Sequence, residues 1–263
     1  MSFIENHQNE ILYMTSSLIP MRHIFTTRIG GVSTGELASL NLGSNRGDDL
    51  ENVRENWKRV CALLGAGEND CAVTKQVHGN IVRVVTAADR HTCLSTVPYE
   101  CDGIVTSEKN LPIWCFTADC IPVLLCDEKA GVVGAIHCGW RSSVTDILNN
   151  ALIAMKGLGA KPENIRAAMG AAIGKCCFET DRDVPDAIET YLSGDTEGLW
   201  TVRADGKYLV DLRAANARRL VQLGVKRENI DISEECTFCC HDKYWSHRYS
   251  KGQRGSQGAV IMI

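Results

Sequence analysis

Apolar residues recur every three to four positions in three stretches of the chain, the spacing that places them on one face of an α-helix. The stretches cover residues 50–64, 144–155 and 211–224. Asp48 and Asp49 precede the first stretch as candidate caps, and a glycine lies at or just beyond the end of each. The pattern therefore predicts three helices with these approximate bounds.

Short continuous apolar runs bounded by turn residues predict strands at 81–85, 121–126, 132–137 and 259–263. Several have the unbroken hydrophobicity of strands buried on both faces. These strands occur in clusters with helices between the clusters. This favours a mixed sheet, or a pair of sheets covered by helices, over a doubly wound nucleotide-binding fold. Neither GxGxxG nor the phosphate-loop pattern GxxxxGK[ST] occurs.

Length and composition suit one globular domain: the chain has 263 residues, of which 44% are hydrophobic and 23% charged. A formal net charge of −4 gives no general attraction to nucleic acid or to anionic membranes, so neither is an expected partner. Acidic Glu5 and Glu10 and the lack of a long apolar run argue against a secretory signal or a membrane span, which predicts a cytoplasmic protein. Thirteen irregularly spaced cysteines are expected to be reduced thiols or metal ligands.

The segment from 117 to 141 carries the first candidate chemistry. Asp119 and Cys120 come just before one predicted strand, and His137 ends the next. A hairpin-like arrangement of these strands would bring Cys120 close to His137. A neighbouring Cys and His form either a thiolate nucleophile with its base or two ligands of a metal, and this pair alone leaves both readings open. A buried core thiol beside a strand-end histidine would give the same pattern.

His78 lies in the segment KQVHGN, at a predicted strand end or turn where side chains can converge on a site. Together with Cys120 and His137 it would supply two imidazoles and one thiolate. This donor set, with a fourth position open to water, is typical of catalytic zinc. An ordinary surface histidine at a turn is the alternative.

A second cysteine group lies near the C-terminus, where Cys236 and Cys239 have the CxxC spacing of half a structural zinc site. Cys176 and Cys177 are adjacent, and no other CxxC occurs, so the sequence offers no matching second half. We therefore expect neither a metal nor a disulfide at this CxxC.

Five separated motifs give the chain a family resemblance: TTRIGGVSTGELASLNLG, KQVHGN, TADCIPVLL, AIHCGWR and YWSHRYSKGQRGSQGAVIMI. Together they resemble the multicopper-polyphenol-oxidase-like, or laccase-domain, family of purine nucleoside phosphorylases. The resemblance runs from about Arg22 to Ile263, which leaves residues 1–20 as an N-terminal extension and 21–263 as the domain. It implies an α/β fold, a single-domain four-layer α/β/β/α sandwich with mixed sheets, and zinc held by His78, Cys120 and His137.

The resemblance also implies an activity. The family is associated with phosphorolysis of adenosine, inosine, guanosine and methylthioadenosine to the base and ribose-1-phosphate, and with deamination of adenosine. Purine nucleosides and phosphate are therefore the expected partners, and Cys120 with the adjacent Asp119 is the expected catalytic pair. Substrate contacts are expected from Arg28, Asn41, Gln76, Arg141 and Arg248. The sequence does not indicate an oligomeric state.

Two positions depart from the family pattern. Cys138 stands where the family has alanine, which would put another thiol near the metal, and Arg254-Gly255-Ser256 replaces a terminal TGR, which weakens an anion-binding role at that end. Three alternatives stay open: a copper-dependent polyphenol oxidase, a metal-free Cys–His hydrolase and a noncatalytic metal-binding protein. The oxidase is the weakest on chemistry, because the chain has seven histidines and no HxH pair for a multicopper centre.

Overall fold

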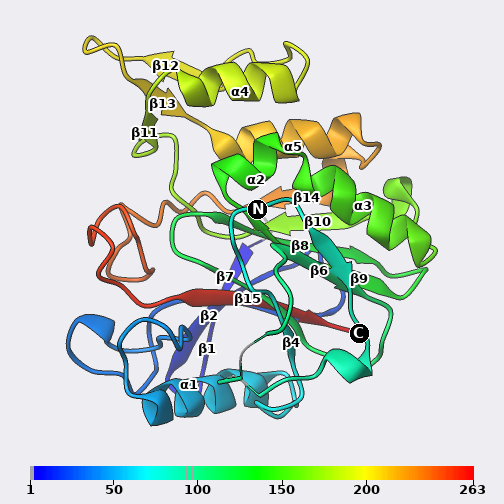
Figure 1. Cartoon of the computed structure of the whole chain (residues 1–263), viewed down its shortest axis with the longest axis vertical. Coiled ribbons are helices and arrows are strands. Elements are labelled where there is room, and N and C mark those ends of the chain that lie inside the picture. The colour runs from blue at the N-terminus through cyan, green and yellow to red at the C-terminus, as the bar shows by residue number, and fades with distance from the viewer. Residues whose placement is uncertain (1–2, 93, 96) are drawn as a thin grey trace.

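The computed structural model describes residues 3–92, 94–95 and 97–263, which form two six-stranded sheets between layers of helices (Figure 1). The first sheet has the order β1 (Phe3–Gln8), β2 (Ile11–Ser16), β3 (Arg22–Thr26), β15 (Gln257–Met262), β7 (Ile113–Thr117), β4 (Ala72–Val73). The second has the order β14 (Ile230–Ile232), β10 (Arg166–Met169), β8 (Ile121–Asp127), β9 (Val132–Cys138), β6 (Gly103–Thr106), β5 (Val82–Val84). Both sheets are mixed, because β4 pairs in parallel with β7 and β5 with β6, whereas most other neighbours are antiparallel.

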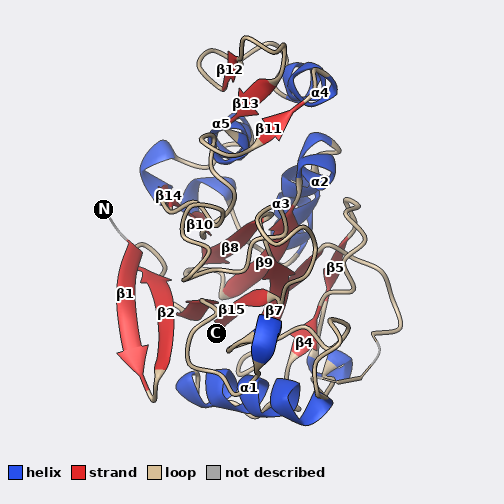
Figure 2. Ribbon diagram, turned by 90° about the vertical axis from the view of Figure 1, so that its left-hand side faces the viewer, coloured by secondary structure: helices blue, strands red, loops and turns tan. Residues whose placement is uncertain are grey.

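Among the residues described, five α-helices accompany the sheets: α1 (Leu50–Leu63), α2 (Trp140–Val144), α3 (Ile147–Gly157), α4 (Asp183–Tyr191) and α5 (Leu212–Gln222). A small third sheet, ordered β11 (Glu179–Thr180), β13 (Tyr208–Val210), β12 (Trp200–Val202), lies with α4 beyond the helical layer (Figure 2). The three predicted helices are present as α1, α3 and α5. The second begins later than its pattern suggests, because Asp146 has φ +68° and separates α2 from α3.

Three hydrophobic clusters fill the spaces between the four layers. Leu124 and Cys126 of β8 pack toward the first sheet, whereas their alternate neighbours Val123 and Leu125 pack toward the helices on the other side. This alternation follows from the two-residue period of a strand and explains why β8 is apolar throughout. On the opposite face of the first sheet, α1 covers a separate cluster that includes Trp57. The predicted four-layer α/β/β/α sandwich is confirmed.

Residues 3–20 contribute to this architecture. Strands β1 and β2 form an antiparallel hairpin, and β2 pairs with β3, so the hairpin extends the edge of the first sheet (Figure 2). Within the described part of the chain, no helix combines the length and the apolar character needed to cross a bilayer.

A hairpin places the ends of β8 and β9 together. In its antiparallel register Ile121 lies opposite Cys138 and Pro122 opposite His137. Cys120, which directly precedes β8, therefore lies beside the end of β9, as the hairpin prediction requires.

Asn56 on the buried face of α1 fixes the loop that follows β3. Its side-chain amide donates to the Ser33 hydroxyl at 2.9 Å and to the Asn41 carbonyl at 2.9 Å, and its oxygen accepts from the Val32 amide at 2.8 Å. The residue is fully buried, so water cannot replace these partners.

We predict that Asn56→Ala lowers the free energy of unfolding by about 3 kcal/mol, because several buried polar groups lose their partners together. Lys58→Ala, on the exposed face of the same helix, should change it by less than about 0.5 kcal/mol. Urea unfolding of both variants provides the measurement. Equal, small effects would show that Asn56 does not hold the loop.

Candidate active site

His78, Cys120 and His137 converge on one point, with their nitrogen and sulfur donor atoms within 4.8 Å of one another. The Cys120 Sγ lies 3.9 Å from His78 Nε2, and the two imidazole rings meet edge to face with centroids 4.9 Å apart. His137 lies next to the last residue of β9, and His78 lies in the loop between β4 and β5. A loop more than forty residues earlier in the chain thus adds its donor to the two that the β8–β9 hairpin brings together.

A buried carboxylate organises these donors. Asp102 accepts hydrogen bonds from the backbone N–H groups of Val77, His78 and Gly79 at 2.8–3.1 Å, and it lies 2.8 Å from His137 Nδ1. These three hydrogen bonds hold the loop in a conformation in which His78 has φ +61°. Pairing of Nδ1 with Asp102 leaves Nε2 of His137 to face Cys120, an arrangement typical of metal-binding histidines.

The electrostatics of the site favour a thiolate. Burial opposes ionisation of Cys120, but the adjacent His137, and then His78, hold the pKa of the thiol below its ordinary value. Burial likewise disfavours a charged His137, but Cys120 and Asp102 raise the pKa of the imidazole. Two imidazoles and one thiolate at these separations fit a single borderline metal ion such as zinc. We therefore treat the three residues as a candidate metal site.

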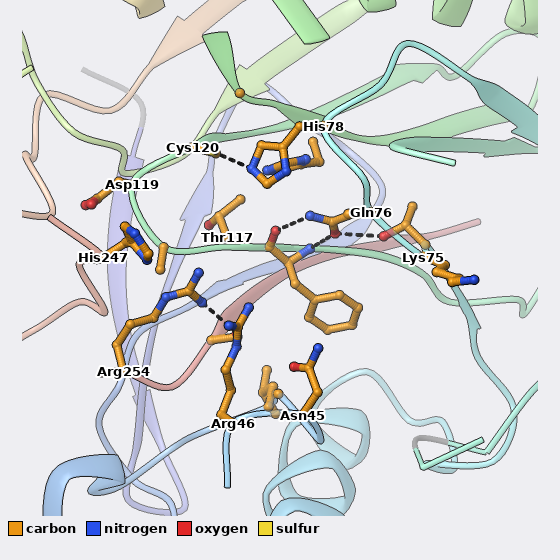
Figure 3. Close-up of a pocket in the computed structure, with 18 of the residues that line it drawn as sticks. Asn45, Arg46, Lys75, Gln76, His78, Thr117, Asp119, Cys120, His247 and Arg254 are labelled. Atoms are coloured by element: carbon orange, nitrogen blue, oxygen red, sulfur yellow. Dashed lines mark hydrogen bonds between the residues drawn. The ribbon is translucent and has the colours of Figure 1, made fainter. Parts of the chain in front are cut away.

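The candidate metal site opens into a pocket of about 620 Å³, a size typical of small-molecule sites. Figure 3 shows His78 and Cys120 at its upper edge and Arg46 and Arg254 at its lower edge. Apolar and polar side chains line the space between, among them Trp57, Val73, Gln76, Val97, Phe116, Ile173, Phe178, Asn45 and His247.

The arginine end of the pocket suits an anion. Arg254 donates to the Ser256 hydroxyl at 3.0 Å, and Arg46 approaches the same oxygen at 3.4 Å. Among the described residues neither arginine forms an ion pair with a carboxylate, and the buried Nε of Arg254 has no hydrogen-bond partner. Burial, and then the neighbouring Arg46, lower the pKa of Arg254 to about 10, so both arginines stay charged at neutral pH. Two converging, unpaired guanidinium groups are a site for phosphate or carboxylate.

Neither arginine was predicted from the sequence to bind substrate. The departure of Arg254-Gly255-Ser256 from the family motif argued against anion binding at that end, yet Arg254 reaches the pocket beside Arg46. Asn41, predicted to bind substrate, is fully buried. Its side chain accepts from the amides of Gly43 and Ser256, and it thereby holds together the two segments that carry the arginines.

Of the other predicted substrate residues, Gln76 and Arg248 line the pocket. The Gln76 amide exchanges two hydrogen bonds of 2.7 Å with the backbone of Phe116, which fixes it against β7. Arg28 and Arg141 lie outside the pocket lining. Arg28 stacks on Trp245 at 4.0 Å and donates to backbone carbonyls, and Arg141 stacks on the neighbouring Trp140 at 4.3 Å.

Asp119, the predicted acid or base, lines the pocket, but its carboxylate is engaged. One oxygen accepts from the Thr237 hydroxyl at 2.6 Å, and the other from the Arg248 backbone amide at 2.7 Å. Cys138, expected near the metal, is fully buried in the hydrophobic cluster on the helical side of the second sheet. Successive strand residues face opposite ways, so His137 points to the donors and Cys138 away from them.

Comparison with known proteins identifies the family of the chain. The family model described as multi-copper polyphenol oxidoreductase laccase matches residues 22–263. The chain is 38% identical over 239 residues to a purine nucleoside phosphorylase of Deinococcus radiodurans, covering 91% of this chain and 88% of the relative. It is 33% identical over 240 residues to purine nucleoside phosphorylase YlmD of Geobacillus stearothermophilus, covering 90% and 88%.

Solved structures extend the comparison to the whole fold. A crystal structure of YlmD from Geobacillus stearothermophilus matches with a TM-score of 0.92 at 30% identity, covering 99% of this chain and 98% of that chain. One of YfiH from Bacillus licheniformis matches with a TM-score of 0.90 at 29% identity, covering 97% of each chain. The chain belongs to the multi-copper polyphenol oxidoreductase laccase family, whose curated members similar to it are named purine nucleoside phosphorylases.

Proposed function

We propose that this protein is a zinc-dependent purine nucleoside phosphorylase that acts on adenosine, inosine, guanosine or methylthioadenosine, with adenosine deamination as a second activity. The observation that carries the proposal is that one pocket contains both the His78, Cys120 and His137 donors and the unpaired guanidinium groups of Arg46 and Arg254. Phosphorolysis needs such a combination, because an anion must be held beside the nucleoside while charge develops on the departing base.

In this proposal His78, Cys120 and His137 would hold zinc, which would supply Lewis acidity toward charge developing on the substrate. Asp102 keeps His137 in the required orientation. The chain carries no bulk positive charge, so local guanidinium groups must bind the phosphate, and Arg46 and Arg254 are placed to do so. Charge-assisted hydrogen bonds from two arginines would neutralise the anion and aim one of its oxygens at the anomeric carbon.

The apolar part of the pocket suits a purine. Phe116 and Trp57 line it beside Val97, and an aromatic side chain can stack on a base of either purine type. His247 lies at the arginine end, where burial and then Arg254 lower the pKa of its imidazole. A neutral imidazole there can accept a proton from phosphate or from a water molecule in deamination. We propose His247 for this role rather than Asp119, whose two oxygens are already occupied.

The names of the relatives support nucleosides and phosphate as substrates. We place the reaction in the cytoplasm, where both substrates occur and where Cys120 would stay reduced. A copper phenol oxidase is less well supported, because the candidate metal site gathers two histidines and one cysteine rather than the many histidines of a multicopper centre.

The direct test is incubation of purified protein with adenosine, with and without phosphate, followed by identification of the products. We predict adenine and ribose-1-phosphate only when phosphate is present, and inosine without it if the second activity holds. Cys120→Ala should lose zinc and both activities. Oxidation of a phenol with none of these products would favour the copper oxidase, and full activity after metal removal would favour the metal-free hydrolase.

Arg46→Ala and Arg254→Ala should each raise the KM for phosphate by about 10- to 100-fold, because each removes a charge-assisted contact worth about 1.5–3 kcal/mol. The KM for the nucleoside should change much less. Arg54→Ala, on the exposed face of α1, is the matched control and should leave both values unchanged. Steady-state kinetics with each substrate varied in turn checks this. An increase confined to the nucleoside KM would show that Arg46 and Arg254 do not bind the phosphate.

A further inference from the structure

We propose that Cys176, Cys177, Cys236 and Cys239 bind a second metal ion in a closed four-thiolate site, with zinc as the ion that the donors best suit. From the sequence, no metal was expected at Cys236 and Cys239, because no second pair of cysteine ligands was apparent. In the folded chain the adjacent pair Cys176 and Cys177, about sixty residues earlier, lies beside them and completes a set of four ligands. The proposal does not depend on the proposed function.

The sulfur positions fit one ion. All four Sγ atoms lie within 4.8 Å of one another, with Cys176 and Cys239 at 3.7 Å and Cys177 and Cys239 at 3.4 Å. Four sulfurs placed tetrahedrally about zinc, at bonds of about 2.3 Å, would be about 3.8 Å apart. A disulfide would require about 2.05 Å. The observed spacing therefore matches the edges of a zinc–thiolate tetrahedron.

Backbone turns present the four thiols. The amides of Cys177 and Phe178 both donate to the Gly174 carbonyl at 2.9 Å, which folds the first segment into a tight turn. In the second segment the amide of Cys240 donates to the Cys236 carbonyl at 2.9 Å. The Gly174 amide in turn donates to the Cys236 sulfur at 3.2 Å, a contact that favours and orients a thiolate.

Ordinary packing does not account for this group. Cys61 and Cys71 illustrate thiols that fill a core, because both are fully buried in the hydrophobic cluster beneath α1, with their sulfurs 3.7 Å apart. Cys176 and Cys239, in contrast, are exposed in loops, where thiols gain little from apolar burial. Cys177 is partly buried and Cys236 is buried, so the four sulfurs gather across the boundary between surface and core, an arrangement better explained by metal binding than by core packing.

The ion would be structural, because four thiolates leave no position for water or substrate. It would join two segments that form one wall of the pocket. Ile173 and Phe178 flank the first cysteine pair, and His247 and Arg248 follow the second. The same two segments are already linked by the Thr237 amide, which donates to the Ala172 carbonyl at 3.1 Å. We infer that the metal fixes this wall.

Zinc content of the full chain, purified under reducing conditions, tests the proposal. We predict two ions per chain in the unmodified protein and one in the Cys236→Ser/Cys239→Ser double variant. The melting temperature of that variant should fall by several degrees, because metal-binding free energy contributes to folding. Cys240→Ser, which alters a neighbouring cysteine outside the group, should keep both ions. Cys120→Ala should lose only the other ion, so the failure of one site can be told from the failure of the other.

Cobalt substitution provides a readout that does not depend on yield or activity. The intense sulfur-to-cobalt charge-transfer absorption should largely persist in Cys120→Ala, and in the double variant it should fall to the weaker band of the single Cys120 thiolate. If the double variant does not fold, slow reaction of four thiols in the Cys120→Ala protein, made fast by a chelator, gives the same evidence. Unchanged zinc content in the double variant would overturn the proposal. So would a mass deficit of two hydrogens that depends on Cys239, since it would reveal a disulfide.

Discussion

The buried carboxylate of Asp102 is the interaction on which the rest of the site depends. A charge removed from water is stable only where hydrogen bonds or opposite charges replace its hydration. Three consecutive backbone amides, from Val77 to Gly79, and the His137 ring provide that replacement. Burial raises the pKa of Asp102, but these partners outweigh burial and hold it below its ordinary value. One charge thereby couples the loop after β4 to the end of β9.

The hydrogen bonds of Asp102 organise the end of the pocket that carries the metal ligands. The backbone amide of His137 also donates to the Asp102 carbonyl at 2.7 Å, so strand pairing and side-chain orientation are fixed together. At the other end, Asn41 performs a comparable task by holding the segments of Arg46 and Arg254 in contact. Neither Asp102 nor Asn41 needs to touch substrate. Each positions groups that would contact the metal or the substrate in the proposed function, and the proposed chemistry depends on both.

The elements with a strong local pattern could be predicted from sequence. The helical stripe of α1 and the apolar run of β8 follow from periods of 3.6 and 2, and the hairpin explains the approach of Cys120 to His137. Local periodicity and a short hairpin connection carry these predictions. The position of His78 at a turn made a third ligand possible, and the family resemblance added the four-layer arrangement and the specific donor set.

The remaining features depend on contacts between distant segments. Arg46 and Arg254 meet across more than two hundred residues, and nothing local distinguishes them from Arg28 and Arg141. Those two arginines instead stack on tryptophans outside the pocket lining. Asp102 lies in no recognisable motif, and its importance appears only when three backbone amides are seen to point at it. The two cysteine pairs could not be connected from the sequence either, because Cys176 and Cys177 lie beside Cys236 and Cys239 only in the folded chain.

The zinc affinity of Asp102→Asn tests the central claim most directly. Asparagine keeps the size of the side chain but removes the charge that compensates His137 and the three amides. Calorimetric zinc titration of the Cys236→Ser/Cys239→Ser background, which isolates the His78, Cys120 and His137 site, should show affinity lowered by about 10- to 100-fold with the folded structure retained. The exposed Asp70→Asn variant serves as the matched control and should bind normally. Unchanged affinity in Asp102→Asn would contradict the claim that this carboxylate organises the site.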